Sequence, residues 1–148
     1  MKFVIQRVTE GSVTVEEKTV GAIKRGYVVL IGVGQNDSQQ EANRLIKKML
    51  GLRIFPDENG KINLSLADVG GSLLLISQFT LYANCRKGNR PSFVDAGDPA
   101  KAEALYEYII DSCRRQVPVV EKGVFGAKMQ VHLCNDGPFT VILDSDVI

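Results

Sequence analysis

The 148-residue sequence is poor in the side chains that make covalent cross-links and metal sites, with three cysteines and one histidine. The number of cysteines is odd, and no Cys-x-x-Cys spacing occurs among Cys85, Cys113 and Cys134, which argues against a disulfide framework. Because His132 is the only histidine, a zinc site is poorly supported as well. We therefore expect no metal and no cofactor.

Long apolar runs and an excess of one charge are also missing. The longest apolar run, residues 27–33, is far shorter than the roughly 20 residues of a membrane span. Gln6 and Arg7 interrupt the apolar N-terminus too early for a secretory signal. Lys and Arg number 18 against 17 Asp and Glu, so the overall basic field typical of duplex binding is absent. We expect a cytoplasmic protein without a membrane or DNA partner, in which any contact with nucleic acid comes from local clusters.

The length and the 45% hydrophobic content predict one domain over residues 1–148. Apolar and polar residues alternate over residues 1–23, which is typical of strands. Residues 27–33 and 73–76 are continuously apolar and predict strands covered on both faces, by helices on one side and by a second sheet or a partner subunit on the other.

Two helices are predicted from their start signals and their apolar spacing. Ser38 and Glu41 form a capping box ahead of an apolar stripe that ends near Gly51. Asp98 as N-cap and Pro99 at the first helical position begin the second helix. The expected fold class is α+β, with mainly antiparallel β-sheets packed against two main helices.

The predicted strand at 73–76 changes character at its end, where Ser77, Gln78 and Thr80 bring polar groups next to buried residues. Such groups are costly when buried unless they form hydrogen bonds, and a ligand is one possible partner. A glycine-containing loop with three cations follows, which suits an anionic group near the strand end: Arg86, Lys87 and Arg90. The alternative is that the hydroxyls bond to neighbouring backbone and the cations form a solvated surface.

A second polar stretch, residues 135–140, lies between two predicted strands at 129–133 and 141–143 and reads as a turn. Gly137 allows close approach of a facing group, and Pro138 has no N–H to give to a sheet. The sequence leaves open whether the Gly137-Pro138 bond is cis.

These two stretches resemble the signature motifs of the D-aminoacyl-tRNA deacylase family, also called the D-tyrosyl-tRNA(Tyr) deacylase family. The matching motifs are Ser77-Gln78-Phe79-Thr80-Leu81 and Asn135-Asp136-Gly137-Pro138 with Thr140. Five further segments match at the expected spacing: Ile5-Gln6-Arg7-Val8, Asn43-Arg44-Leu45, Arg53-Ile54-Phe55, Arg90-Pro91-Ser92-Phe93 and Ala104-Leu105-Tyr106. The sequence departs from the family pattern at Phe139, where a smaller aliphatic residue is expected, and at Cys85, where a hydroxyl residue is more usual.

The resemblance implies a homodimeric enzyme that hydrolyses the ester of D-aminoacyl-tRNA, and of glycyl-tRNA mischarged on tRNA(Ala). A Gly-Pro backbone motif from one subunit would reject L-amino acids in the pocket of the other, and the terminal ribose 2′-hydroxyl would assist. The implied catalytic residues are Thr80, Ser77, Gln78 and Phe79. The substrate-binding residues are Gly137, Pro138, Ala102, Met129 and Arg7, of which Arg7 steadies the Gly-Pro loop. The cations Arg86, Lys87 and Arg90 are expected to contact the aminoacylated 3′ end of the tRNA.

From the residues alone, no side-chain triad is readable, because neither motif contains a histidine, lysine or carboxylate suited to act as a general base. His132 is close in sequence to the second motif, but a solvent-facing or structural histidine is the simpler interpretation. Without the resemblance, two alternatives remain open. One is a Ser/Thr hydrolase of small esters, and the other is a non-catalytic RNA-binding module.

Overall fold

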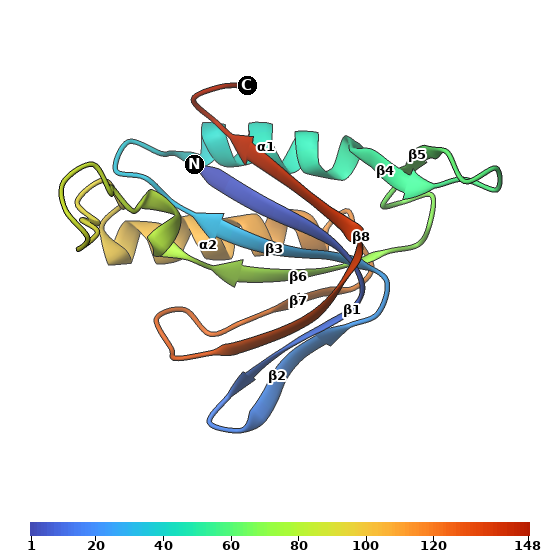
Figure 1. The fold of residues 1–148 in the computed structure, drawn as a ribbon, viewed down its shortest axis with the longest axis horizontal. Coiled ribbons are helices and arrows are strands. Elements are labelled where there is room, and N and C mark those ends of the chain that lie inside the picture. Colours follow the sequence, from blue (N-terminus) through green and yellow to red (C-terminus); the bar gives the residue numbers. More distant parts are fainter.

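The computed structural model describes all 148 residues and shows one large curved sheet, a small two-stranded sheet and two helices (Figure 1). The large sheet has six strands: β1 (Lys2–Val15), β2 (Lys18–Ile23), β3 (Gly26–Gly32), β6 (Ser72–Ser77), β7 (Val120–Lys122) and β8 (Gln130–Asp144). The small sheet pairs β4 (Arg53–Pro56) with β5 (Ile62–Ser65). The helices are α1 (Gln39–Gly51) and α2 (Pro99–Arg114), and a 3-10 turn, η1 (Phe79–Tyr82), follows β6.

Strand β1 organises the large sheet, because both of its edges are paired. One edge pairs with β8 over nearly its whole length, and the other pairs first with β3 and then with β2. These pairings are antiparallel, whereas β3–β6 and β6–β7 are parallel. The expected α+β class with mainly antiparallel pairing and two main helices is confirmed.

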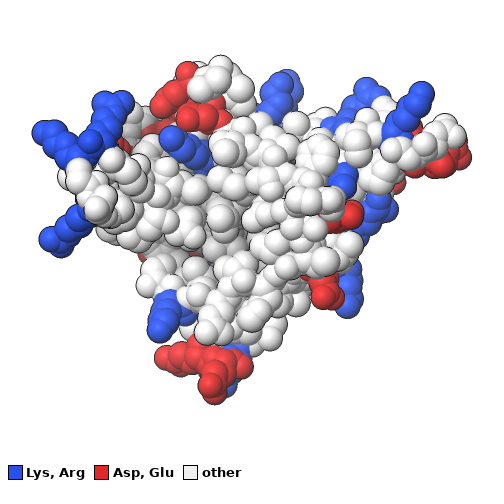
Figure 2. Space-filling view, in the orientation of Figure 1, with Lys and Arg blue, Asp and Glu red and all other residues white.

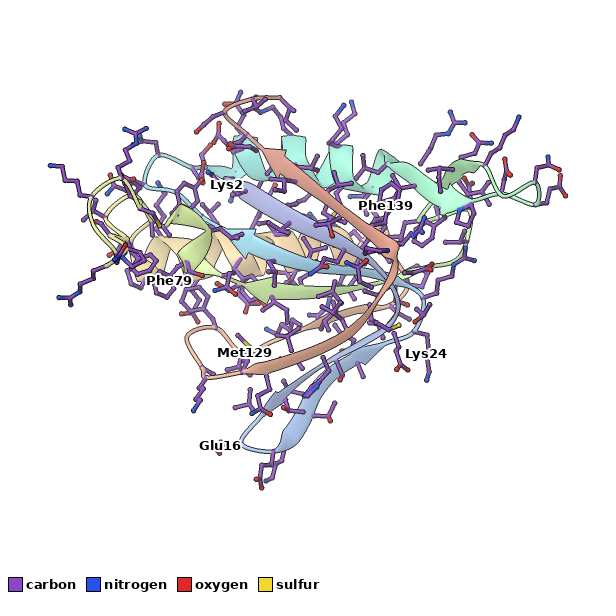
Figure 3. The ribbon with its side chains drawn as sticks, in the orientation of Figure 1. Lys2, Glu16, Lys24, Phe79, Met129 and Phe139 are labelled. Atoms are coloured by element: carbon purple, nitrogen blue, oxygen red, sulfur yellow. The ribbon has the colours of Figure 1, made fainter.

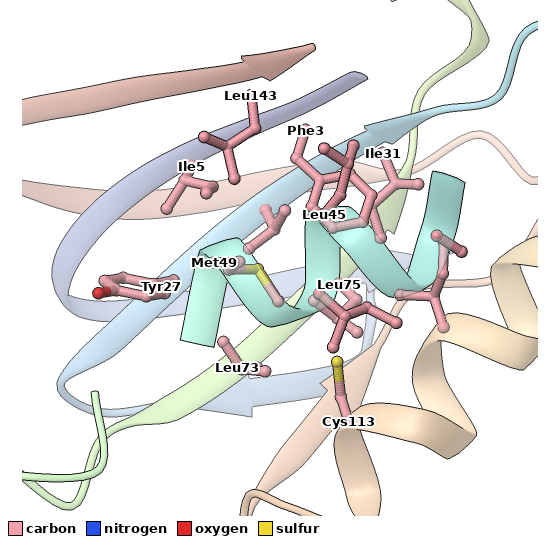
Figure 4. Packing of buried hydrophobic residues seen from close by; sticks show 14 of the residues in the cluster. Phe3, Ile5, Tyr27, Ile31, Leu45, Met49, Leu73, Leu75, Cys113 and Leu143 are labelled. Carbon is pink, nitrogen blue, oxygen red and sulfur yellow. The ribbon is translucent and has the colours of Figure 1, made fainter. Parts of the chain in front are cut away.

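Two apolar clusters fill the two faces of the central strands. The larger one lies between the sheet and the helices and contains Phe3, Tyr27, Leu45 and Cys113 (Figure 4). The smaller one lies on the opposite face, where β1 and β2 curl back over β3 and β6: Val8, Val13, Ile23, Val28, Leu74 and Ile76. The predicted strands at 27–33 and 73–76 are therefore covered on both faces, as their continuous apolar sequence requires.

Both predicted helix starts are confirmed. The Ser38 side chain accepts from the Gln40 N–H, and Glu41 accepts from the Ser38 N–H at 2.8 Å, which forms the capping box. Asp98 caps α2 by accepting from the N–H of Lys101, and a proline stands at the start of that helix. Neither helix combines the length and apolar composition that a membrane crossing needs.

The interpretation of residues 135–140 as a turn between two strands is wrong. Strand β8 runs through this segment, and the residues before and after it pair with the same strand, β1. Thr140 pairs with Gln6 and Asn135 pairs with Val8, so residues 136–139 bulge out opposite Arg7 alone. Glycine and proline mark such a bulge as well as a turn, and the local sequence does not distinguish them. The Gly137-Pro138 peptide bond is cis.

Candidate active site

A cavity of about 700 Å³ lies where β3 and β6 end, beneath the start of α2. Five of the residues singled out in the sequence meet there and line it: Ser77, Gln78, Phe79, Ala102 and Met129. Figure 3 shows Phe79 and Met129 on the same side of the molecule, one after β6 and the other before β8. Much of the remaining lining is apolar and includes Phe93, Val94 and Phe125, to which the sequence gave no expected role.

Residue Thr80 belongs to η1 and does not line the cavity itself. Its Oγ1 accepts a hydrogen bond of 2.5 Å from Nε2 of Gln78. The first hydrogen bond of the turn runs from the Leu81 N–H to the Gln78 carbonyl at 3.3 Å. The N–H groups of Phe79 and Thr80 precede that bond, so the turn supplies no acceptor for them. The turn therefore leaves these two backbone donors without a partner of its own, and Phe79, which carries the first of them, lines the cavity.

Turn η1 is held against the end of β3 by a buried carboxylate that sequence reasoning missed. Asp37 Oδ2 accepts from the Gly34 N–H at 2.6 Å and from the Tyr82 hydroxyl at 3.3 Å. Its Oδ1 accepts from the Met1 ammonium at 2.7 Å. A side chain at position 34 would lie 2.8 Å from the Tyr82 ring, so glycine permits this close packing.

Burial raises the pKa of the Tyr82 hydroxyl above its ordinary range, and nearby carboxylates add to the shift. Asp37 stands in the polar run before α1, where it reads as an ordinary loop residue. No sequence signal distinguishes it from its exposed neighbours, because its partners lie far along the chain.

Beside the cavity, the rings of Phe79 and Phe93 make an edge-to-face pair with centroids 5.1 Å apart. The pair is partly open to solvent, since Phe79 is 57% exposed. The predicted basic loop begins next to it, and its ends are joined by backbone hydrogen bonds between Asn84 and Ser92. The three cations of this loop are exposed and form no ion pair: Arg86, Lys87 and Arg90. Blue side chains cluster at the left edge of Figure 2, where this loop lies in Figure 1.

The remaining predicted residues form a second group on the β8 bulge. Arg7 is buried and donates to the Asp136 carbonyl from Nε at 3.1 Å and from Nη2 at 2.8 Å. Its Nη1 donates to the Ile54 carbonyl at 2.6 Å, and its guanidinium lies over the Phe139 ring at 4.7 Å. Arg7 therefore ties β1 and β4 to the segment that carries Gly137-Pro138. The aromatic residue at 139 adds a packing contact to this support.

The two groups of residues do not meet within the chain. Neither Gly137 nor Pro138 lines the cavity. In Figure 3 Met129, at the cavity, lies just before the start of β8, whereas Phe139, at the bulge, lies beside the bend of that strand on the other side of the molecule. Arg7 likewise lies with the bulge, away from the cavity residues.

The cavity offers little side-chain acid or base. Asp98 is the only ionisable residue of its lining, and its carboxylate caps α2. His132 is exposed and borders a different hollow of about 530 Å³, between β8 and β2. The arrangement therefore suits chemistry in which the protein binds and polarises a carbonyl with backbone donors and does not attack it with an activated side chain.

Comparison with known proteins agrees with this description. The sequence profile of the D-Tyr-tRNA(Tyr) deacylase family matches residues 4–144. The D-aminoacyl-tRNA deacylase of Thermotoga petrophila is 54% identical over 145 residues, covering 98% of this chain and 97% of that protein. The Koribacter versatilis enzyme of the same name is 55% identical over the same shares. A solved structure of a c-Myc DNA unwinding element binding protein superimposes with a TM-score of 0.92 at 42% identity, covering 97% of this chain and 98% of that one.

A probable eukaryotic D-amino acid tRNA deacylase shares the fold at a TM-score of 0.81 and 19% identity, over 96% of this chain and 97% of that one. By sequence the protein is a hydrolase, and the chain belongs to the D-Tyr-tRNA(Tyr) deacylase family. Its activity is that of a D-aminoacyl-tRNA deacylase, as the resemblance of the two motifs implied.

Proposed function

We propose that the cavity receives the acyl end of a D-aminoacyl-tRNA and that the N–H groups of Phe79 and Thr80 hold the carbonyl oxygen as water attacks the ester. The observation that carries this proposal is that η1 leaves two backbone donors without an acceptor beside a cavity whose only ionisable lining residue, Asp98, is engaged in capping α2. One well-placed donor of this kind contributes roughly 2.7 to 4 kcal/mol to transition-state stabilisation. The terminal ribose 2′-hydroxyl orients or activates the water, and the ribose hydroxyl at the ester is the leaving group.

The Thr80→Ala variant tests whether a side chain or the backbone supplies the catalysis. The substitution removes the Thr80 hydroxyl, which accepts a hydrogen bond from Gln78, but the backbone N–H groups of Phe79 and Thr80 remain. We expect the single-turnover rate on D-aminoacyl-tRNA to fall by about 10-fold, which corresponds to about 1.4 kcal/mol. Complete loss of turnover in a folded variant that still binds tRNA would identify Thr80 as a nucleophile and would refute the backbone mechanism.

Selectivity in this proposal comes from the main chain at Gly137-Pro138, which holds the substrate amino group and occupies the space that an L side chain needs. Rejection of the L-enantiomer by about 10³ corresponds to about 4 kcal/mol. A clash with rigid backbone supplies such a difference more readily than a lost contact. Glycine has no side chain to clash, so glycyl-tRNA, including glycine mischarged on tRNA(Ala), remains a substrate.

This division of labour requires a second copy of the chain, because the bulge lies away from the cavity of its own subunit. An aliphatic row supports a homodimer, since Ile142, Val4, Leu30 and Ile76 are register neighbours on β8, β1, β3 and β6. The row ends at Ile76 in the cavity, and Ile142 is 67% exposed. Figure 2 shows a broad central area of this face that is nearly free of charged side chains. A second copy seated there would bury the row and carry its bulge toward the facing cavity.

Sedimentation tests the dimer directly. We expect the unmodified protein to sediment as a dimer at assay concentrations, and Ile142→Asp to shift it toward monomer because a charge would be buried in the interface. Val147→Asp is the matched control, because Val147 is 80% exposed and lies outside the aliphatic row. A fully active protein that sediments only as monomer would exclude a site built from two subunits.

The tRNA itself is recognised in this proposal by the basic loop and the neighbouring aromatic pair. The cations Arg86, Lys87 and Arg90 suit phosphates near the 3′ end, and the open ring of Phe79 offers a surface for an unpaired base. Because aminoacylated tRNA is the substrate, we infer that the protein acts in the cytoplasm as a proofreading enzyme of translation.

The deciding experiment incubates the purified protein with D-, L- and glycyl-tRNA carrying matched tRNA. We expect hydrolysis of the D and glycyl esters and a rate on the L ester that is lower by about 10³ or more. Similar rates on D and L esters would refute the selectivity mechanism. Cleavage of aminoacyl esters that lack tRNA would favour a small-ester hydrolase. Salt-sensitive binding of tRNA ends without release of amino acid would favour an RNA-binding module.

A further inference from the structure

The bulge on β8 leaves main-chain groups without partners in the sheet, and side chains take over their hydrogen bonds. Residues 136–139 have no register partners on β1, where Arg7 is the one residue between the paired positions Gln6 and Val8. Arg7 binds the carbonyl of Asp136, which fixes the first half of the bulge. The second half is fixed from a different source, because the Phe139 N–H donates to Oδ1 of Asn135 at 2.9 Å. This bond spans the Gly137-Pro138 corner from one side to the other.

The Asn135 amide is itself held in one orientation. Its Nδ2 donates to Oε1 of Gln6 at 2.5 Å and to Oγ1 of Thr140 at 3.2 Å, so both ends of the amide are engaged. The Thr140 hydroxyl donates to the same Gln6 oxygen at 3.4 Å. Gln6 lies on β1 opposite Thr140, at the point where regular pairing resumes. Gln6, Asn135 and Thr140 therefore close the base of the bulge.

We propose that Gln6 and Asn135 are positioning residues for stereochemical selection, because they lock the second half of the corner that Arg7 holds at its first half. This inference rests on the proposed role of Gly137-Pro138 in excluding L side chains. Gly137 adopts φ +130°, and a side chain there would lie 3.1 Å from Nη2 of Arg7, so the corner has little room to move toward β1. The hydrogen bonds of Gln6 and Asn135, here called the lock, fix the corner from the other side.

The functional consequence differs for the two enantiomers. An L side chain is excluded by main chain that does not yield, so the exclusion is lost when the corner moves by a fraction of an ångström. A D substrate makes no such clash, so movement of the corner weakens only its amino-group contact there, and the donors at Phe79 and Thr80 lie on another element. Loss of the lock therefore raises the rate on L-aminoacyl-tRNA and leaves the rate on the D ester nearly unchanged. A residue with a merely structural role would lower both rates together.

The test measures single-turnover rates on D- and L-aminoacyl-tRNA of one amino acid for Asn135→Ala and Gln6→Ala. We expect each variant to lower the D-to-L rate ratio at least 10-fold, with the D rate within about 3-fold of the unmodified protein. Gln6→Glu retains the ratio, because its carboxylate accepts both bonds made to Gln6 Oε1. Gln130→Ala is the control, since Gln130 is an exposed amide on β8 at the far end of its pairing with β1.

A second readout is amide exchange at Phe139, which we expect to accelerate in Asn135→Ala because the N–H loses its acceptor. If Asn135→Ala does not fold, the test uses Gln6→Ala and Asn135→Asp. The Asn135→Asp variant keeps the acceptor for the Phe139 N–H and loses the donor to Gln6. If the unmodified protein discriminates between the esters and the folded variants keep its D-to-L rate ratio, the positioning role of Gln6 and Asn135 is overturned. The role of the Gly137-Pro138 corner then stands. Equal cleavage of both esters by the unmodified protein would overturn the role of the corner and this inference with it.

Discussion

Replacement of Ala102 by phenylalanine is expected to lower kcat/KM on D-aminoacyl-tRNA by about 100-fold or more. Ala102 is half-buried near the start of α2 and lines the cavity of about 700 Å³ together with Phe79 and Met129. A phenyl ring at this position would project into the space that the acyl group needs. A substrate displaced by about 1 Å already loses on the order of 10²-fold in rate. The loss should appear in activity and hardly in stability, because a ring in an apolar hollow does not strain the fold.

The matched control is Ala104→Phe, on the same helix. Ala104 is exposed and does not line the cavity, so the same change of size and helix propensity should leave the rate within about 2-fold. Steady-state kinetics on D-aminoacyl-tRNA, with thermal melts of both variants, provide the measurement. If Ala102→Phe retains full activity in a folded protein, the acyl group binds elsewhere.

Replacement of Asp37 by alanine is expected to lower the free energy of unfolding by about 3 to 5 kcal/mol, because the buried Met1 ammonium would lose its charged partner. The Gly34 N–H and the Tyr82 hydroxyl would lose their acceptor at the same time. The melting temperature should fall by roughly 6 to 20 °C for a domain of this size. Since Tyr82 belongs to η1, the rate on D-aminoacyl-tRNA should fall below that of the unmodified protein even where the variant is fully folded.

Chemical denaturation and single-turnover assays at a temperature well below melting separate the two effects. Asp111→Ala is the control, because Asp111 lies exposed on α2 and makes no ion pair. The free energy of unfolding of Asp37→Asn should lie between those of the unmodified protein and Asp37→Ala, because the amide oxygen retains one acceptor while the charge is lost. A melting temperature of Asp37→Ala within about 2 °C of the unmodified protein would show that the buried pair contributes little.

Local patterns predicted the fold class and the element starts well, because each depends on residues close in the chain. The Ser38 capping box and the Asp98 N-cap specify helix starts through bonds that span three or fewer residues. The apolar run at 73–76 predicted a strand buried on both faces. Residues 135–140 defeated the same approach, because glycine and proline permit a bulge or a turn and only the pairing with β1 decides between them.

In the candidate site, too, local sequence predicted the residues of a continuous motif but not those brought together by the fold. The motif at Ser77 to Thr80 was recognised as a unit, and the structure places it at a cavity with Ala102 and Met129. The roles of these residues in catalysis stay predictions. Asp37 was not found, because its importance comes from three donors that converge only in the folded chain.

The sequence by itself determined both helix starts and the buried strands at 27–33 and 73–76, because short-range spacing carries that information, and its two motifs carried the resemblance to the family. The tertiary structure decided that the Gly137-Pro138 corner lies away from the cavity of its own chain, and that side chains of Gln6, Arg7 and Asn135 hold it. The reason is physical: Arg7 and Gln6 bind residues of β8 that lie 129 positions further along the chain, and the curvature of a sheet that brings such segments together is a property of all its strands.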